Sequence, residues 1–280
     1  MRKIDAKLIS DIVEKLCIDA NYNLPEDIFD NLKEREKKEE SKLGVSILKN
    51  IIENAEVAKK REIPICQDTG IAVVFVEIGQ DVHIVNGSLK EAINEGVRNG
   101  YNKGFLRKSM VGDPIIRMNT NDNTPAIIHY NIVGGDKLSI TVAPKGAGSE
   151  NMSALKMLKP SDGIEGVKKF ILDTVEAAGP NACPPLIVGV GIGGNFEYAP
   201  LLAKKALLRP IGVNNDDEDI KSLEIELLEK INKLGIGPQG LGGTTTALAV
   251  NIEKYPTHIA CLPVAVNIGC HVTRHASATL

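Results

Sequence analysis

The first part of the chain has the hydrophobic spacing of amphipathic helices. Apolar side chains recur every three or four positions in residues 4–16 and again in residues 43–52, which places them on one face of a helix. Pro25 suits a first helical turn, because proline lacks the N–H that would be unpaired there. The charged run 33–41 is typical of a solvated helix end. The pattern predicts a helical N-terminal segment over residues 1–60.

Later in the chain the pattern changes to short, β-branched apolar runs, typical of strands, which alternate with helical stretches. Ser88 followed by Glu91 fits a capping box that opens a helix, and Gly104 can end that helix. The segment GGD (134–136) separates two strand-like runs and predicts a tight hairpin between them. Strands are expected at 71–78, 125–133, 137–144, 186–194, 244–252 and 258–266, and helices at about 88–103, 162–178, 197–208 and 217–234.

The order of these elements predicts the fold class. No internal repeat, low-complexity stretch or long linker interrupts the sequence. We therefore expect a mixed α/β fold in one domain over residues 1–280, with the helical segment 1–60 followed by an α/β body over residues 61–280.

Composition narrows the functional classes. Tryptophan is absent and aromatic residues make up only 4% of the chain, so a surface that stacks nucleic-acid bases is not expected. The formal net charge of −3 argues against a polyanionic partner, although a small anionic substrate could still bind in a local basic pocket. Charges are spread through the N-terminal residues, so neither a signal peptide nor a membrane span is expected, and the expected location is cytoplasmic.

The five cysteines fall into two groups. Cys17 and Cys261 lie inside apolar helix or strand patterns, where a cysteine packs as a small hydrophobe. Cys66, Cys183 and Cys270 differ, since two of them lie in polar, turn-forming loops, although each taken alone could also be a packing residue. Three thiols far apart in sequence lack the close pairs of a zinc finger and suit an iron–sulfur cluster. A cubane with three cysteine ligands leaves one iron open as a Lewis acid.

Five segments carry a resemblance to a known family. They are ICQDTG (65–70), KGAGSEN (145–151), GPNACPPLIVGVGIGGN (179–195), GIGPQGLGGTTTALAV (235–250) and THIACLPVAVNIGCHVTRHA (257–276). Together and in this order they resemble the alpha subunits of class I fumarate hydratases and L(+)-tartrate dehydratases, and the N-terminal domain of single-chain class I fumarases. The resemblance extends over essentially the whole chain. It implies a hydro-lyase that reversibly hydrates fumarate to (S)-malate, a 4Fe–4S cluster as cofactor, and a separate beta subunit in an α2β2 assembly.

The resemblance also implies roles for particular residues. The implied cluster ligands are Cys66, Cys183 and Cys270; the implied substrate contacts are Gln67, Asp68, Arg107 and either Gly146 or Gly148; and the implied catalytic residues are Asp68 and His258. Arginine can hold a carboxylate with two parallel hydrogen bonds, which lysine cannot. Without the resemblance, Arg107 would be a solvated surface arginine and Asp68 a turn residue before Gly70. The catalytic base is expected in the beta subunit.

Other functions remain open. The nearest alternative is the alpha subunit of L(+)-tartrate dehydratase, which acts on a dihydroxy acid. A second is a non-catalytic iron–sulfur or nucleotide-binding protein, because the glycine run 189–194 resembles a dinucleotide-binding loop. Its spacing departs from G-x-G-x-x-G, so a tight turn that lets the backbone approach a cluster or a helix is favoured. His271 and His275, beside Cys270, are not expected to bind metal, because the family pattern does not use them.

Overall fold

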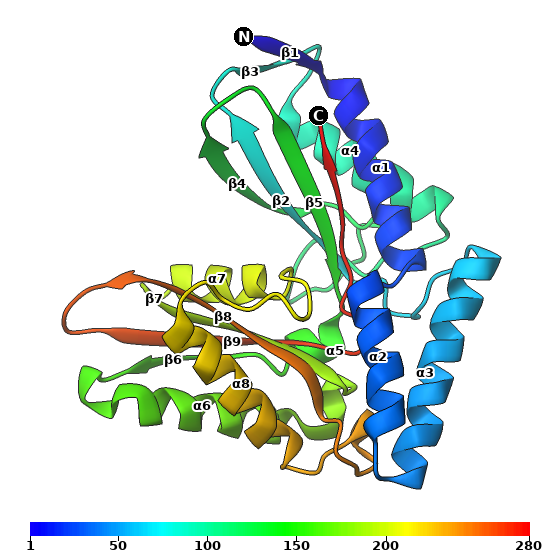
Figure 1. Ribbon diagram of the computed structural model, residues 1–280. Helices are drawn as coiled ribbons and strands as arrows, with labels where there is room; N and C mark the ends of the chain where they lie inside the picture. Colours follow the sequence, from blue (N-terminus) through cyan, green and yellow to red (C-terminus); the bar gives the residue numbers. More distant parts are fainter. The chain divides into compact units, whose positions relative to one another are not determined.

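The computed structural model describes all residues from 1 to 280 and divides them into two compact units. Unit 1 consists of Met1–Pro25, Ala55–Ala147 and Arg274–Leu280, and unit 2 consists of Glu26–Asn54 and Gly148–Thr273. Each unit has its own four-stranded sheet and its own hydrophobic core (Figure 1). No helix combines the length and the apolar character needed to cross a bilayer.

The predicted helical N-terminal segment is confirmed. In the first helix Ile9, Val13 and Leu16 are buried on one face, and Asp5 caps the helix by accepting the N–H of Lys7 at 2.7 Å. A four-residue strand comes before this helix, although the apolar spacing predicted a helix there. The bounds are β1 Arg2–Asp5, α1 Ala6–Tyr22, α2 Glu26–Lys38 and α3 Lys42–Arg61.

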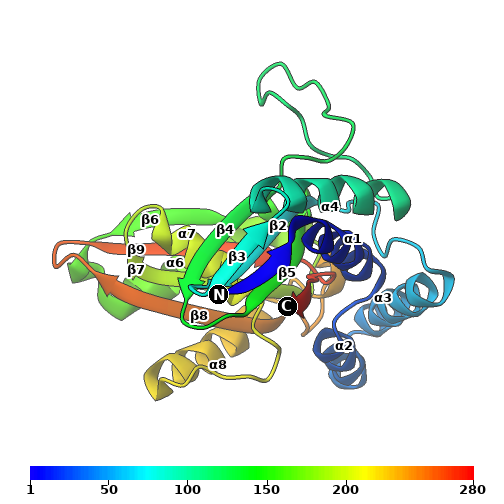
Figure 2. The same cartoon turned by 90° about the horizontal axis from the view of Figure 1, so that it is seen from above.

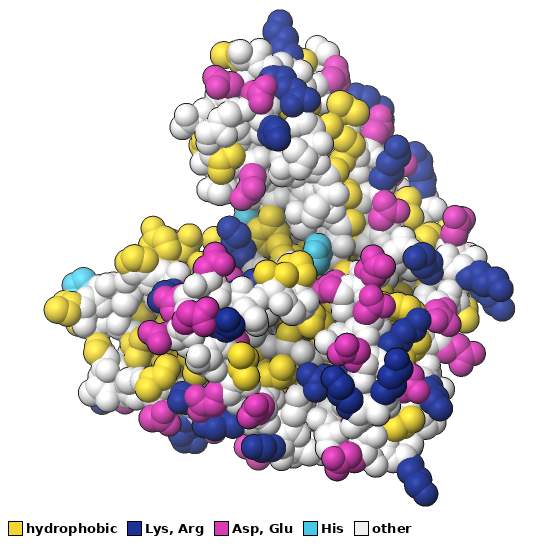
Figure 3. Space-filling model, viewed as in Figure 1, with side chains coloured by type: hydrophobic (Ala, Val, Ile, Leu, Met, Phe, Trp, Pro, Cys, Tyr) yellow, Lys and Arg dark blue, Asp and Glu magenta, His cyan; other side chains and the backbone are white.

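The charged run 33–41, which spans the end of α2, is exposed or partly exposed with one exception. Figure 3 shows charged side chains of both signs crowded on the surface over α2 and α3. Glu39, however, is buried, and its carboxylate accepts the backbone N–H of Ser41 at 3.0 Å and that of Thr244 at 2.9 Å. Glu39 therefore fastens the end of α2 to the loop at residues 241–246, a role that a charge pattern does not reveal.

In unit 1, α1 and α4 pack against the sheet and share one hydrophobic core with it (Figures 1 and 2). Ala72, Val74 and Val76 of the central strand point into this core. The strand expected at 71–78 and the helix expected at 88–103 are confirmed, although Ser88 makes no side-chain cap hydrogen bond. The sheet order is β10-β5-β2-β4, with β2 Ile71–Gly79, β4 Ile127–Val133, β5 Leu138–Lys145 and β10 Ala276–Thr279; β3 Val82–Val85 pairs with β1, and α4 is Leu89–Lys103.

The predicted hairpin between residues 125–133 and 137–144 is wrong. β2 lies between the two strands, parallel to β4 and antiparallel to β5. The end of β2 enters the turn that the pattern assigned to the hairpin, where the N–H of Gly79 donates to Lys137 O at 2.8 Å. A β-carbon at Gly79 would lie only 2.2 Å from Gly135 O. The buried, continuous apolar run of β2 has a partner on each edge, and a local turn pattern cannot indicate this.

The connection from α4 to β4 is long and projects from unit 1 (Figure 2). Val111 and Asn119 form a β-bridge within it. Ile115 and Ile116 near its tip are 88% and 73% exposed. Arg107 lies near its start, four residues after the end of α4.

In unit 2 the second sheet has α7 on one face and α6 with α8 on the other (Figure 1). Val188 and Val190 of β7 point into the core formed with α6 and α8. The strands and helices predicted here are confirmed, with shifted ends. The sheet order is β6-β9-β7-β8, with β6 Ala154–Leu158, β7 Leu186–Gly194, β8 Ala247–Thr257 and β9 Leu262–Gly269; the helices are α6 Gly163–Ala178, α7 Tyr198–Ala206 and α8 Glu218–Asn232, and the short helices of the chain are α5 Ala147–Glu150, η1 Pro160–Asp162, η2 Gly179–Ala182 and η3 Pro238–Gly240.

The glycine run of β7 is a strand that lets a helix approach closely. Gly189 and Gly191 alternate with the core valines and face α7. A β-carbon at Gly189 would lie 2.2 Å from Ala203 O, and one at Gly191 would lie 2.1 Å from Ala199 O. The predicted approach of backbone to a helix is therefore confirmed, whereas the predicted tight turn is wrong, because the glycine run continues β7.

Replacing Gly191 with alanine is expected to lower the free energy of unfolding by about 3 kcal/mol, the upper end of the usual cost of overpacking. The added methyl would meet the backbone of α7, which cannot move aside without shifting the whole helix. Gly134→Ala is the matched control, because nothing lies within 4 Å of its β-carbon position. Denaturant unfolding of both variants measures the difference; equal stabilities would contradict this packing.

The turn between β8 and β9 lies at a different position from the one that the sequence predicts. β8 continues to Thr257, so His258 lies in the turn and does not begin a strand. Cys261 lies in the same turn and is only partly buried, so its expected place inside a packed strand is wrong. Pairing with β7 extends β8, since Tyr255 still pairs with Gly193. In contrast, Cys17 of unit 1 is fully buried, as expected.

Candidate functional site

In unit 1, Cys66 is the first residue of a polar stretch in the loop between α3 and β2. The sulfur of Cys66 accepts the backbone N–H of Asp68 at 3.4 Å. The residue is partly exposed, so a ligand can reach the sulfur. An N–H directed at sulfur is one of the contacts by which proteins tune cluster-bound cysteines.

Asp68 has a fixed carboxylate within this loop. Its Oδ1 accepts the N–H of Gly70 at 3.0 Å, and its Oδ2 accepts the N–H of Ala147 at 2.8 Å. Gly146 lies against the same group, because a β-carbon there would be 3.1 Å from Asp68 Oδ2. Asp68 therefore serves as a turn residue, and each carboxylate oxygen keeps a lone pair for a further donor.

Arg107 lies next to this loop. Its carbonyl oxygen accepts a hydrogen bond from Thr69 Oγ1 at 2.9 Å. The side chains of Arg107 and Gln67 are both exposed, so both can meet a ligand. Unit 1 thus brings together four of the predicted substrate contacts: Gln67, Asp68, Arg107 and Gly146.

Two buried side chains hold this loop in place, and neither was predicted from the sequence. Tyr101 donates its hydroxyl to Thr69 O at 2.7 Å, and Arg274 donates from Nη2 to Asp68 O at 2.6 Å. Burial raises the pKa of the Tyr101 phenol, which keeps the hydroxyl protonated as a donor. Arg274 belongs to the family segment 257–276, so the motif carried a signal for it; Tyr101 showed only the spacing of a buried helix face.

In unit 2 the loops of Cys183 and Cys270 lie against each other. The N–H of His271, the residue after Cys270, donates to Cys183 O at 3.2 Å. The two loops lie together because β7 and β9 are antiparallel: Ile187, near the start of β7, pairs with Gly269, the last residue of β9. Cys183 is exposed and Cys270 is partly buried, so both thiols can reach a ligand. The structure therefore brings two of the three predicted cluster ligands together within one unit.

Gly148, the other candidate for a backbone contact, belongs to the same unit as these cysteines. A β-carbon there would lie 3.6 Å from Asn181 O, which is ordinary contact distance. Asn181 lies two residues before Cys183. Gly146 is therefore close to Asp68, whereas Gly148 is close to the Cys183 loop.

His258 lies at the opposite end of the unit 2 sheet from the two cysteines. β7 runs from the Cys183 loop to Gly194, which pairs with Thr257, directly before His258. Eight steps along the strand from Leu186 to Gly194, at about 3.3 Å each, amount to roughly 25 Å. The structure therefore does not bring His258 to the Cys183–Cys270 pair of its own chain.

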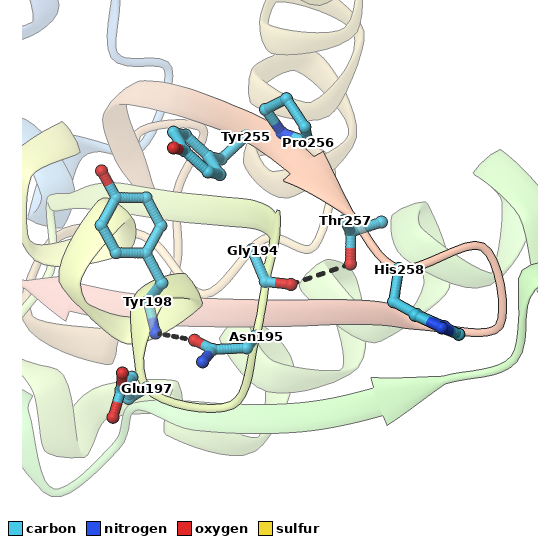
Figure 4. A pocket seen from close by; sticks show the side chains of 8 residues that line it. All are labelled: Gly194, Asn195, Glu197, Tyr198, Tyr255, Pro256, Thr257 and His258. Atoms are coloured by element: carbon cyan, nitrogen blue, oxygen red, sulfur yellow. Dashed lines mark hydrogen bonds between the residues drawn. The ribbon is translucent and has the colours of Figure 1, made fainter.

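A pocket of about 460 Å³ opens beside His258 (Figure 4). The ends of β7 and β8 and the start of α7 line it. Tyr198 and Tyr255 meet edge to face across it with ring centroids 4.6 Å apart, and Thr257 Oγ1 donates to Gly194 O at 2.9 Å. His258 is thus one of the residues that line this pocket, at the end of the sheet away from Cys183 and Cys270.

The chemistry of the thiols fits an iron–sulfur cluster. The accessible pair of Cys183 and Cys270 can supply two thiolate ligands within unit 2, and Cys66 of unit 1 is also partly exposed. Cys17 is different, because burial raises the pKa of its thiol and keeps it protonated. No three His, Cys, Asp or Glu side chains form a metal-binding group within either unit. The pair therefore has no third such ligand inside unit 2.

Comparisons with known proteins identify the family of this chain. The sequence model of the family described as fumarate hydratase (fumerase) matches residues 10–279. A Methanocaldococcus jannaschii protein provisionally named L(+)-tartrate dehydratase subunit alpha is 48% identical over 274 residues, which cover 96% of each chain. The L(+)-tartrate dehydratase subunit alpha of Escherichia coli K12 is 34% identical over 96% of this chain and 89% of its own. The resemblance found in the sequence is confirmed: the chain belongs to the fumarate hydratase (fumerase) family of hydro-lyases.

Proposed function

We propose that this chain is the alpha subunit of a two-subunit class I fumarate hydratase, which reversibly hydrates fumarate to (S)-malate. Membership of a hydro-lyase family and the accessible Cys183–Cys270 pair support the proposal. Cys66, Cys183 and Cys270 would hold a 4Fe–4S cluster. Held by three cysteines, such a cluster supplies a Lewis acid for the departing hydroxyl.

The residues of unit 1 would bind and orient the substrate. Arg107 would hold a carboxylate with two parallel N–H···O bonds. The Asp68 carboxylate, already fixed by the N–H groups of Gly70 and Ala147, would accept a hydrogen bond from the substrate hydroxyl, beside the Gln67 amide. Because the Asp68 carboxylate is positioned before the substrate arrives, less entropy is lost on reaching the reacting geometry.

A separate beta subunit would complete the active site. Both relatives are named subunit alpha, which implies a beta partner for each of them. We place the base that takes the C3 proton of malate in that partner, and we propose an α2β2 assembly.

His258 would act in the active site of a second alpha chain. Roughly 25 Å of β7 separates it from Cys183 of its own chain, which is too far for both residues to touch one four-carbon substrate. The turn that carries His258 is open to a partner, since Ile259 is 93% exposed. In a two-fold symmetric dimer each chain would then donate its histidine to the other site.

L(+)-tartrate is the second candidate substrate, because both relatives carry the name of its dehydratase. The description of the matching family, in contrast, names fumarate. Tartrate has one hydroxyl more than malate, and a site that hydrogen-bonds this hydroxyl discriminates strongly against a substrate without it.

The substrate is tested with the purified alpha–beta complex. We expect kcat/KM for (S)-malate and fumarate to exceed that for L(+)-tartrate by about 100-fold or more. The reverse ratio would assign the chain to tartrate dehydration. Turnover of none of these acids by a complex that contains its cluster would overturn the proposal.

A further inference from the structure

The short turn η3 contacts both cysteine loops of unit 2. The backbone N–H of Gln239 and its side-chain Nε2 each donate to Pro184 O at 2.8 Å. The same Nε2 lies 3.1 Å from His271 Nδ1. Pro184 directly follows Cys183, and His271 directly follows Cys270. One side chain therefore links the residues that come after two of the proposed cluster ligands.

The orientation of the Gln239 amide follows from its partners. Pro184 O can only accept, so the amide nitrogen, and not the amide oxygen, must face it. The second N–H of this nitrogen faces His271 Nδ1, which also lies 3.0 Å from Cys183 O. In one tautomer Nδ1 accepts from the Gln239 amide, and in the other it donates to Cys183 O. The backbone N–H of His271 donates to Cys183 O. The Gln239 amide, Pro184 O, His271 and Cys183 O thus form one cluster of polar contacts that joins the two loops.

The backbone of Gln239 indicates that its side chain is needed. Its φ is +54°, in the left-handed region that favours glycine. The next residue, Gly240, lies directly on the segment before Cys183, because a β-carbon there would be 2.3 Å from Pro180 Cβ. A non-glycine residue in this conformation, in a turn rich in glycine, points to a function of its side chain.

The loop that carries Gln239 is itself anchored. The N–H of Gly237 donates to Thr246 Oγ1 at 3.1 Å, and the N–H of Thr244 donates to both carboxylate oxygens of Glu39 at 2.9 and 3.1 Å. Because this loop is held by these hydrogen bonds, the side chain of Gln239 can in turn hold the two cysteine loops in position.

We propose that Gln239 is a positioning residue that holds Cys183 and Cys270 at the separation a cluster requires. This inference rests on the proposed function. Groups that orient metal ligands typically contribute 10- to 100-fold to metal affinity, and ligands held in place beforehand lose less conformational entropy on binding. Without the Gln239 side chain, the cluster would dissociate about tenfold faster or more.

Two variants and one control test the role in the anaerobic alpha–beta complex. Gln239→Met keeps the length of the side chain and removes both N–H donors. Gln239→Gly removes the side chain and relieves the left-handed backbone, so it remains informative if the methionine variant folds poorly. Gln80→Met is the control, because Gln80 is an exposed turn residue of unit 1. The measurement is the rate at which the visible absorption of the cluster disappears in the presence of an iron chelator.

We expect this rate to rise about tenfold or more in both Gln239 variants and to stay unchanged in the control. A second readout needs no cluster. Phenylarsine oxide binds two neighbouring thiols, so in a Cys66→Ser, Cys261→Ser background the cluster-free chain should bind it about tenfold more weakly once Gln239 is replaced. A wild-type complex without any cluster would refute the proposed function. A wild-type cluster with equal rates of loss, or equal arsenical binding, would refute the positioning role alone.

Discussion

Replacing Cys183 with serine is expected to remove the cluster and to lower the hydratase activity of the alpha–beta complex by at least about a thousandfold. Serine keeps the size of the side chain but replaces a soft thiolate by a hydroxyl, a poor ligand for cluster iron. The loss follows from the several kcal/mol of transition-state stabilisation that a Lewis acid contributes. Visible absorption, iron content and turnover, measured on one preparation, report the cluster and the reaction together.

Cys261→Ser is the matched control for this experiment. Cys261 is also an accessible cysteine of unit 2, but it lies in the β8–β9 turn, at the other end of the sheet from Cys183. This variant should keep its iron and its activity. If the Cys183 variant behaved like the control, the assignment of this residue as a cluster ligand would be wrong.

A mixed dimer of two inactive alpha chains is expected to recover activity. One chain carries Cys183→Ser and the other carries His258→Ala. If His258 serves the site of the partner chain, the chain with His258→Ala keeps its cluster and receives an intact histidine from its partner. One of the two sites is then complete, so mixed dimers purified through two different tags should show about half of the wild-type activity.

The two parent dimers are the controls, and each should be close to inactive. The recovered activity should disappear when both chains of the mixed dimer carry Cys183→Ser. If His258 acts within its own chain, neither site of the mixed dimer has both residues, and activity stays at the level of the parents. That result would contradict the roughly 25 Å separation as an argument for the partner site.

Local patterns predicted most elements, because helices and strands depend mainly on nearby residues. The spacing of Ile9, Val13 and Leu16 indicates α1 without knowledge of its partners. Strand pairing was not predictable in the same way. β2 separates two strands that are neighbours in sequence, and the short β10 pairs with β5, where Ser277 lies opposite Thr141. Such pairings depend on contacts between distant residues, which no turn pattern contains.

The residues of the candidate site could likewise be named from the sequence, but their contacts could not. The ordered family segments pointed to Cys183 and Cys270, and the structure joins their loops. The same segments named His258 but could not show that β7 places it at the far end of the sheet. Gln239 and Arg274 lie inside those segments as well, yet their roles depend on the carbonyl groups they meet in the folded chain.

The central claim is that this chain carries a catalytic 4Fe–4S cluster on Cys66, Cys183 and Cys270. It is tested most directly by iron and acid-labile sulfide content per alpha chain, measured on the active alpha–beta complex after anaerobic purification. We predict about four iron and about four sulfide per alpha chain. Full turnover by a complex with far less than one iron per alpha chain would contradict the account.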